Sequence, residues 1–359
     1  MMNDLLAQEL LAKTTGWGTE KLTEERKDLQ LLAQYKYDGY QQFEPGMRFI
    51  ESLARWLGQF EESSRDVAYD FIKNNLLYIS EAEMNHIIRL VYPDFVRRLL
   101  MKRFAADMDI KEHKVRKISR DDRFRIREHQ CLFLGLSDGA RIDALCRFSG
   151  LRHEQTHPTY TVTEETATSM LDDLQCVLSD KGAPGDAKYK YVFLVDDFSA
   201  SGQSYLRCKD GGPGGKIARF NDERQNGRLK DICEDEAQVY VVLYVATKRA
   251  KNHILRIARE SKIKIDDVIV IVELDDATCM TEEGLGDFAP LAEEKLDPSI
   301  ITKYYKVGRH DKPHMGFDEC GLPVVLGHNC PNNSLPIIWC ESKFARCRAL
   351  FPRVERHKV

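Results

Sequence analysis

The sequence predicts an α/β protein in which a parallel sheet is preceded by a small helical module. Residues 45–105 carry apolar side chains at helical spacing, whereas from Cys131 onward short apolar runs rich in β-branched residues alternate with helical stretches. Such alternation is typical of a parallel sheet with helices on its faces. We therefore expect a helical module and basic linker over residues 1–125 and an α/β domain over residues 126–359.

The helical module is expected to contain three helices after a polar, helical N-terminal stretch. Apolar residues predict one helix between Phe49 and Phe60 and a second around Phe71. Ser80 and Glu83 have the spacing of a capping box, which predicts the start of a third helix. Pro93 is expected to kink or end that helix.

Four runs predict the strands of the α/β domain: "CLFLGL" from Cys131, "YKYVFLV" from Tyr189, "VYVVLYVA" from Val239 and "DDVIVIVEL" from Asp266. Runs that are apolar at almost every position are typical of strands buried on both faces. A helix is expected over residues 248–261. The long stretch between the first two runs is expected to hold a helix and a flap that closes over a site.

Composition limits the function class. No run of about eighteen apolar residues occurs, and the start lacks the pattern of a secretory signal, so we expect a cytoplasmic protein without membrane association. The ten cysteines form neither a CxxC pair nor a cluster with histidine, which favours reduced structural thiols over a metal site.

The segment from Arg97 to Arg127 is strongly basic although the whole chain has a net charge of −4. It holds twelve Lys and Arg against five Asp and Glu. Two interpretations stay open, a surface that contacts phosphates and a solvated helix face.

The stretch "KYVFLVDDFSASGQSYL", Lys190 to Leu206, carries the main functional prediction. A loop of small hydroxylated residues follows a buried strand and is expected to lead into a helix near Gly202, so that backbone N–H groups, serine hydroxyls and the helix dipole converge on an anion. Asp196 and Asp197 would then face sugar hydroxyls or Mg²⁺. The predicted phosphate-binding residues are Ser199, Ala200, Ser201, Gly202, Gln203 and Ser204.

Other interpretations of this stretch are a Walker B strand, for which no Walker A partner is present, and a buried strand with an aspartate cap and a serine-rich turn. The run "GGPGGK", Gly211 to Lys216, does not fit a P-loop, since Asp210 and Ile217 occupy required positions. We expect a flexible turn there, after the first helix of the site.

Two further loops are candidate parts of the site. "CLFLGLSDGARIDALCR" again reads as strand, small-residue loop and helix, with Ser137, Asp138, Gly139 and Arg141 at the turn. Near the C-terminus a strand enters a loop rich in amides, where polar side chains either face a cleft or hold the loop to itself. These side chains are His328, Asn329, Asn332 and Asn333.

The aspartate and serine stretch resembles the signature of type I phosphoribosyltransferases, which bind 5-phosphoribosyl-1-diphosphate (PRPP). Together with "SDGARID", "HEQ", "PTY" and "HNCPNNSLPIIW", it looks like the phosphoribosyltransferase-like domain of bacterial conflict systems, over about residues 130–345. A segment similar to a winged helix often precedes that domain, and residues 45–105 match it loosely. The resemblance implies a parallel-sheet phosphoribosyltransferase-like core.

The resemblance also implies residue roles. Asp196 and Asp197 would hold the ribose hydroxyls and, through them, Mg²⁺, while residues 199–204 would hold the 5′-phosphate. Gly139 and Arg141 would contact the diphosphate. Asp138 departs from that pattern, and it would bind magnesium, cap the helix or disturb diphosphate binding.

At the level of function, the resemblance implies an effector of antiphage defence that binds PRPP or a phosphoribosyl nucleotide and displaces diphosphate. Some relatives accompany retron reverse transcriptases, so a reverse transcriptase with its RNA–DNA product is the expected partner. The alternative is a non-catalytic nucleotide sensor that controls a partner protein or nucleic acid. The acceptor and a homo-oligomeric state stay open.

Overall fold

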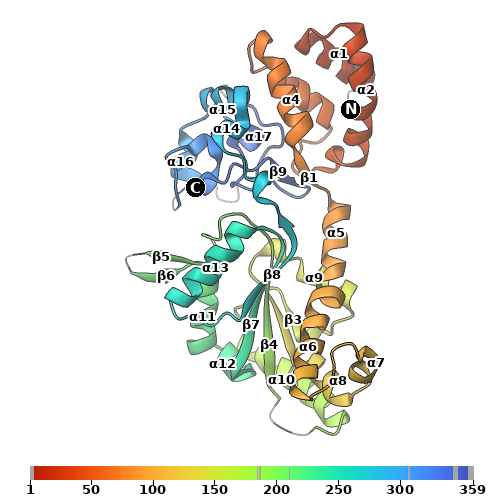
Figure 1. Ribbon diagram of the computed structural model, residues 1–359, viewed down its shortest axis with the longest axis vertical. Helices are drawn as coiled ribbons and strands as arrows, with labels where there is room; N and C mark the ends of the chain where they lie inside the picture. Colours follow the sequence, from red (N-terminus) through yellow and green to blue (C-terminus); the bar gives the residue numbers. More distant parts are fainter. Residues whose placement is uncertain are drawn as a thin grey trace. The chain divides into compact units, whose positions relative to one another are not determined.

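The computed structural model describes residues 4–183, 185, 187–209, 211–305, 308–342 and 347–354. The chain forms two compact units, which Figure 1 shows as ribbons. The helical unit comprises residues 1–84 and 275–359, and the sheet unit comprises residues 85–274. The boundary expected after residue 125 falls within α8 (Asp122–His129) of the sheet unit.

The sheet unit is built on five parallel strands in the order β3-β2-β4-β7-β8. The four strands expected from apolar runs are confirmed, and every residue of the first of them is buried. The two-residue β3 has no such run and was not expected. The strands are β2 (Cys131–Gly135), β3 (Thr156–His157), β4 (Tyr189–Ser199), β7 (Cys233–Thr247) and β8 (Asp267–Leu274).

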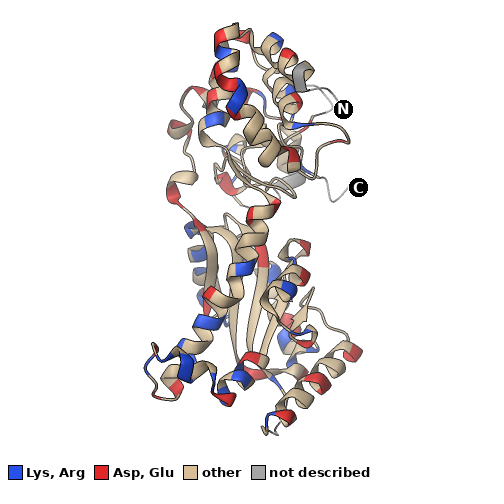
Figure 2. Cartoon of the chain, turned by 90° about the vertical axis from the view of Figure 1, so that its right-hand side faces the viewer, with Lys and Arg blue, Asp and Glu red and all other residues tan. Residues whose placement is uncertain are grey.

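Helices cover both faces of this sheet (Figure 1). On one face, Leu132 and Leu194 belong to a core with Leu174, Phe220 and Ile254 from three covering helices. On the other face, aromatic rings of three neighbouring strands stack in a row. The helices of this unit include α6 (Arg97–Asp107), α7 (Val115–Ser119), α9 (Ile142–Ser149), α10 (Glu164–Asp180), α11 (Lys216–Asn226), α12 (Leu229–Ile232) and α13 (Lys248–Glu260). Charged residues lie mainly on helices and loops, and few lie on the central strands (Figure 2).

The helical unit joins the two ends of the chain in one core. Its first part holds α1 (Asp4–Thr15), α2 (Thr19–Tyr35), α3 (Phe49–Leu57), α4 (Arg65–Asn75) and β1 (Leu77–Ile79), and its second part holds α14 (Glu282–Leu285), α15 (Ala289–Glu294), α16 (Ser299–Tyr304), β9 (Val324–Leu326) and α17 (Pro336–Trp339). Leu77 pairs with Val324 in a parallel two-stranded sheet. The buried Trp56 donates its indole N–H to the carbonyl oxygen of Ile337 at 2.8 Å.

The helices expected around Phe49 and Phe71 are confirmed as α3 and α4. The capping box is also present, since Glu83 accepts from the Ser80 backbone N–H at 2.8 Å and its own N–H donates to the Ser80 hydroxyl at 3.3 Å. It starts α5 (Glu81–Leu90). At Pro93 the chain adopts a π-helical segment, Val91–Val96, and then continues into α6.

No helix in the described part of the chain combines the length and apolar character needed to cross a bilayer.

Candidate functional site

The candidate site lies where the strand order of the sheet reverses. If the five strands are numbered by their position in the chain, their order across the sheet is second, first, third, fourth, fifth. The loops that follow β2 and β4 therefore leave adjacent strands at the reversal point. Ligands of open α/β sheets bind at this point, outside the carboxyl ends of the strands. The fold therefore brings two of the three predicted loops together, residues 137–141 and 196–204.

Asp196 is fully buried and already has donors. Its carboxylate accepts from the Ser137 hydroxyl at 2.5 Å, from the Tyr205 hydroxyl at 2.8 Å and from the ammonium group of Lys216. Burial raises the pKa of Asp196 above its usual value, against the lowering effect of Lys216. In this structure Asp196 thus ties together β4, the loop after β2 and the start of α11.

Asp197 faces the other side of the sheet, because successive side chains of a strand alternate. It is half-buried and lies against Gly139, where a Cβ atom would be 2.4 Å from a carboxylate oxygen of Asp197. Only glycine allows this approach, which explains on steric grounds why a glycine occupies this position of the predicted "SDGAR" loop. Asp138 is exposed beside it. The joint role of Asp196 and Asp197 toward one ribose stays a prediction, and only Asp197 offers exposed surface.

The loop after β2 has an unusual backbone at Arg141, which has φ 47° and lies in the left-handed region. Non-glycine residues in this region are strained and are found often at binding sites. The buried Tyr244 hydroxyl supports the turn by donating to the carbonyl oxygen of Ala140 at 2.5 Å. Arg141 also stands at the N-terminal cap position of α9.

A cavity of about 630 Å³ adjoins this loop. Its lining includes Ser137, Asp138, Arg141, Ile142, Cys146 and His153. Pro158 and Thr159 add a further wall, so the stretch after Arg152 does border the site. Its closure over a ligand stays a prediction.

The serine-rich loop differs from the expectation, because no helix begins near Gly202. After β4 the chain makes turns, then forms an antiparallel hairpin of β5 (Arg207–Lys209) and β6 (Gly212–Gly214), and α11 begins only at Lys216. Gly202 has φ 77° and packs on α13, where a Cβ atom would be 3.0 Å from the Ala250 carbonyl oxygen. The loop therefore packs on α13 and does not lead into a helix of its own.

Within this loop the Ser199 hydroxyl is buried and has no hydrogen-bond partner among the described residues. Buried polar groups are nearly always paired, so an orphaned hydroxyl at the end of β4 needs an explanation such as a ligand. By strand alternation Ser199 lies on the same face as Asp197. Ala200 is fixed nearby, since Thr247 donates to its carbonyl oxygen at 2.5 Å.

The sequence did not reveal Lys216 and Tyr205 as parts of the site. Lys216 ends the run "GGPGGK", and the hairpin returns it to Asp196, twenty positions earlier. Gly215 has φ 114°, and a Cβ atom there would lie 2.4 Å from the Tyr205 carbonyl oxygen, so this glycine permits the return. The run is thus part of a hairpin, and it does not follow a helix of the site as expected.

The third predicted loop belongs to the helical unit. The Asn333 amide donates to the carbonyl oxygen of Phe317 at 3.0 Å, and the Asn329 side-chain oxygen accepts from the Val354 backbone N–H at 3.3 Å. Of the two roles expected for these side chains, the structure therefore favours holding the loop in place over facing a cleft. His328 and Asn332 are half-buried in the same loop.

The described residues contain no group of three or more His, Cys, Asp or Glu side chains arranged to hold an ion. The cysteines are all free thiols.

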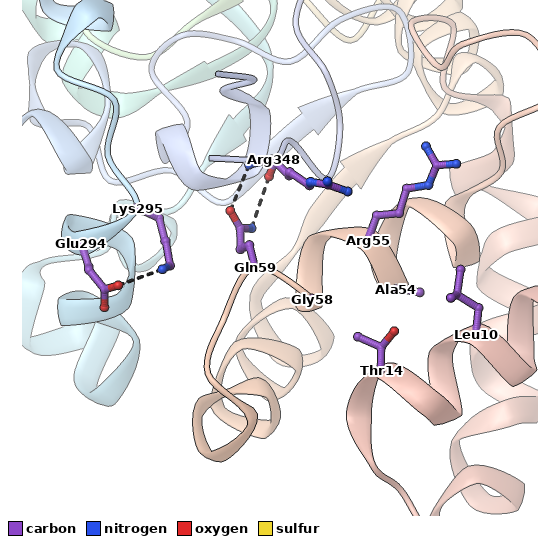
Figure 3. A pocket seen from close by; sticks show the side chains of 9 residues that line it. All are labelled: Leu10, Thr14, Ala54, Arg55, Gly58, Gln59, Glu294, Lys295 and Arg348. Atoms are coloured by element: carbon purple, nitrogen blue, oxygen red, sulfur yellow. Dashed lines mark hydrogen bonds and ion pairs between the residues drawn. The ribbon is translucent and has the colours of Figure 1, made fainter. Parts of the chain in front are cut away.

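The helical unit has a cavity of about 690 Å³ of its own (Figure 3). Lys295 pairs with Glu294 at 2.8 Å, and the Gln59 amide holds the backbone of Arg348, accepting from its N–H at 3.0 Å. None of the predicted site residues lines this cavity, and the Gln59–Arg348 hydrogen bond joins two distant segments of the unit beside it. Its lining residues are Leu10, Thr14, Ala54, Arg55, Gly58, Gln59, Glu294, Lys295 and Arg348.

A parallel sheet with two polar loops at its reversal point is consistent with a phosphoribosyltransferase-like α/β fold. The PRTase-CE family model matches residues 53–353, most of the chain. The chain therefore belongs to the PRTase-CE family, which confirms the resemblance found in the sequence. No curated protein and no solved structure matches it.

Proposed function

We propose that the reversal point of the sheet binds PRPP, or a nucleotide carrying a phosphoribosyl group, together with Mg²⁺, and that the protein displaces diphosphate from it. The observation that carries this proposal is the meeting of the Gly139 loop and the Asp197–Ser204 loop at one sheet edge. Family membership supports a phosphoribosyltransferase-like function in general.

Asp197 would accept hydrogen bonds from the ribose hydroxyls, since it is half-buried whereas Asp196 is fully buried. The unpaired Ser199 hydroxyl and the neighbouring loop would donate to the 5′-phosphate. Lys248 and Arg249 begin α13, on which that loop rests, and their charges and the N-terminal end of the helix favour an anion there.

Mg²⁺ fits as an ion that arrives with the substrate. The exposed Asp138 and the half-buried Asp197 supply the oxygen ligands that Mg²⁺ prefers, and the phosphate oxygens and water would complete its octahedron. The ion would neutralise charge on the diphosphate.

The reaction breaks the bond between ribose C1 and the diphosphate oxygen, and the electron pair leaves with the diphosphate. A nucleophilic acceptor then forms a bond to C1 and gives up its proton. The chain's own part is to orient the ribose through Asp197 and to fix the diphosphate through the Gly139 amide and Arg141. The residues of this site do not specify the acceptor.

The second candidate function is a nucleotide sensor without catalysis. It is favoured by the burial of Asp196, because the Lys216 ion pair removes one of the two carboxylates from direct ligand contact. A sensor binds the same ligand but releases no diphosphate.

The test is calorimetric titration of the full chain with PRPP and Mg²⁺. We expect binding by the wild type and about 10- to 100-fold weaker binding by Asp197→Asn, which loses charged hydrogen bonds. Asp172→Asn is the matched control, because Asp172 is an exposed carboxylate of α10 in the same unit. Absence of wild-type binding, or equal binding by Asp197→Asn, refutes the site.

A second measurement separates the two candidates. Diphosphate release from PRPP, followed with water or a mixture of nucleobases as acceptor, supports the enzyme. Binding without release under any of these conditions supports the sensor. We further propose a cytoplasmic role in antiphage defence beside a reverse transcriptase and its RNA–DNA product, as the resemblance in the sequence implies.

A further inference from the structure

Among the twelve cations of the basic segment, residues 97–127, Arg103 is half-buried over the Tyr240 ring, and the other eleven are of two kinds. Four arginines form ion pairs: Arg97 with Glu128, Arg123 with Asp121, Arg125 with Asp122 and Arg127 with Asp107. Seven others are exposed, and none of them forms an ion pair with a described residue. These seven, called the basic surface below, are Arg98, Lys102, Lys111, Lys114, Arg116, Lys117 and Arg120.

The fold explains why these seven point outward. Leu100 and Phe104 of α6, Ile118 of α7 and Phe124 of α8 are all buried, so the apolar sides of these helices are used in packing. Every residue from Lys111 to Lys117 is exposed. Figure 2 views the chain from the side on which α6–α8 lie in Figure 1, and both basic and acidic residues are coloured along the helices seen there.

A surplus of close, unpaired cations on a chain of net charge −4 repels itself and favours a polyanionic partner. We propose that the basic surface binds the phosphodiester backbone of a nucleic-acid duplex without reading its sequence. The sequence left open whether this segment is a solvated face or a surface that contacts phosphates. The structure separates the arginines that form ion pairs within the protein from the seven exposed cations that could contact phosphates.

The surroundings of the basic surface favour a duplex over other polyanions. Single strands need exposed aromatic rings on which bases stack, and an anionic membrane is held best by a face that also inserts apolar side chains. The one large apolar side chain exposed among the described residues of this segment is Val115. Backbone phosphates require only cations, which the basic surface supplies.

The expected signature is salt dependence. For duplex DNA the logarithm of the binding constant falls with the logarithm of salt concentration with a slope of about −0.9 per phosphate contact. If about five of the seven cations make contacts, the slope is about −4 to −5. Loss of three contacts would weaken binding at about 0.1 M salt by roughly two to three orders of magnitude and reduce the slope by about 3.

The experiment measures binding of the full chain to a fluorescent duplex of about 20 base pairs with random sequence, from about 50 to 300 mM salt. The test variant is Lys114→Gln, Arg116→Gln, Lys117→Gln. The matched control is Lys13→Gln, Arg26→Gln, Lys27→Gln, which removes two lysines and one arginine from exposed positions of α1 and α2. Single strands of the same sequence and phosphatidylserine vesicles serve as competing ligands.

We expect a steep salt dependence for the wild type, the predicted loss for the test variant and unchanged binding for the control. Equal affinity and slope in the test variant overturn the proposal, as does an equal loss in the control, which would reflect net charge alone. Binding to vesicles or single strands without binding to the duplex also overturns it. PRPP binding by the test variant should equal that of the wild type, so failure here is distinct from failure of the proposed function.

Discussion

Replacement of Lys216 by methionine is the sharpest test of how the site is built. Lys216→Met keeps the aliphatic stem but leaves the buried Asp196 carboxylate without its cation. Removal of one partner from a buried ion pair typically costs about 3–5 kcal/mol. Asp196 keeps its hydrogen bonds from Ser137 and Tyr205, so we expect a loss of about 2–4 kcal/mol in the free energy of unfolding of the sheet unit.

The assay must report on the sheet unit. Trp17, Trp56 and Trp339 are the tryptophans of the chain, and all belong to the helical unit, so tryptophan fluorescence follows that unit. Hydrogen exchange of β4 and β7 peptides, measured by mass spectrometry at increasing denaturant, follows the sheet. We expect Lys216→Met to lower the protection of these peptides while the fluorescence transition stays in place.

The matching control removes both charges. In Lys216→Met combined with Asp196→Asn, the buried group is neutral, so the double variant should be more stable than the sum of the two single losses implies. A loss below about 0.5 kcal/mol for Lys216→Met, or strict additivity in the double variant, would refute the role assigned to the pair.

The same variant has a defined pH dependence. Burial raises the pKa of Asp196 above its usual 3.8, and removal of Lys216 takes away the main effect that lowers it. Between pH 3.8 and the raised value, the folded variant binds a proton that the unfolded chain does not. The difference in unfolding free energy between the wild type and the less stable Lys216→Met should therefore shrink as pH falls from 7 toward 4.

Three other perturbations test separate parts of the structure. Burial lowers the pKa of His129 from 6.5 to about 4, so the wild type should lose stability as pH falls through this range. The expected loss is about 1–2 kcal/mol after allowance for partial exposure, and His129→Gln should flatten the dependence of the unfolding free energy on pH, measured by denaturation. Gly139→Ala should place a methyl group against Asp197, destabilise the sheet unit by about 1–3 kcal/mol and weaken PRPP binding at least tenfold in calorimetry. Phe288→Ala removes a ring stacked on Phe71 at 4.0 Å and should cost the helical unit about 3–5 kcal/mol, seen as an earlier fluorescence transition with unchanged exchange of β4.

The strands were predictable because each central strand of a parallel sheet must be apolar on both faces. Four apolar runs each became a strand of the sheet, although β8 lies at its edge and is mostly half-buried. The prediction of a helix beginning near Gly202 was wrong for a local reason. A strand followed by small residues is the usual start of a helix in this fold class, but here a hairpin with its own glycines intervenes before Lys216.

The grouping of the C-terminal segment with the N-terminal helices could not be predicted from local patterns. The pairing of Leu77 with Val324 and the bond from Trp56 to Ile337 join positions more than two hundred residues apart. Apolar periodicity shows that such residues are buried but does not show against what. The amide-rich loop that includes Asn333 belongs to the helical unit, and its place in one site with the aspartates stays a prediction.

The two aspartates look equivalent in the sequence, and strand geometry makes them different. Because side chains alternate along β4, Asp196 turns toward Tyr205 and Lys216, while Asp197 turns toward Gly139. Asp196→Asn should therefore mainly lower stability, and Asp197→Asn should mainly lower ligand affinity with little change in hydrogen exchange. If instead both variants lost affinity equally and kept full stability, the ion pair would have to open during binding, and the two carboxylates would act together on the ligand.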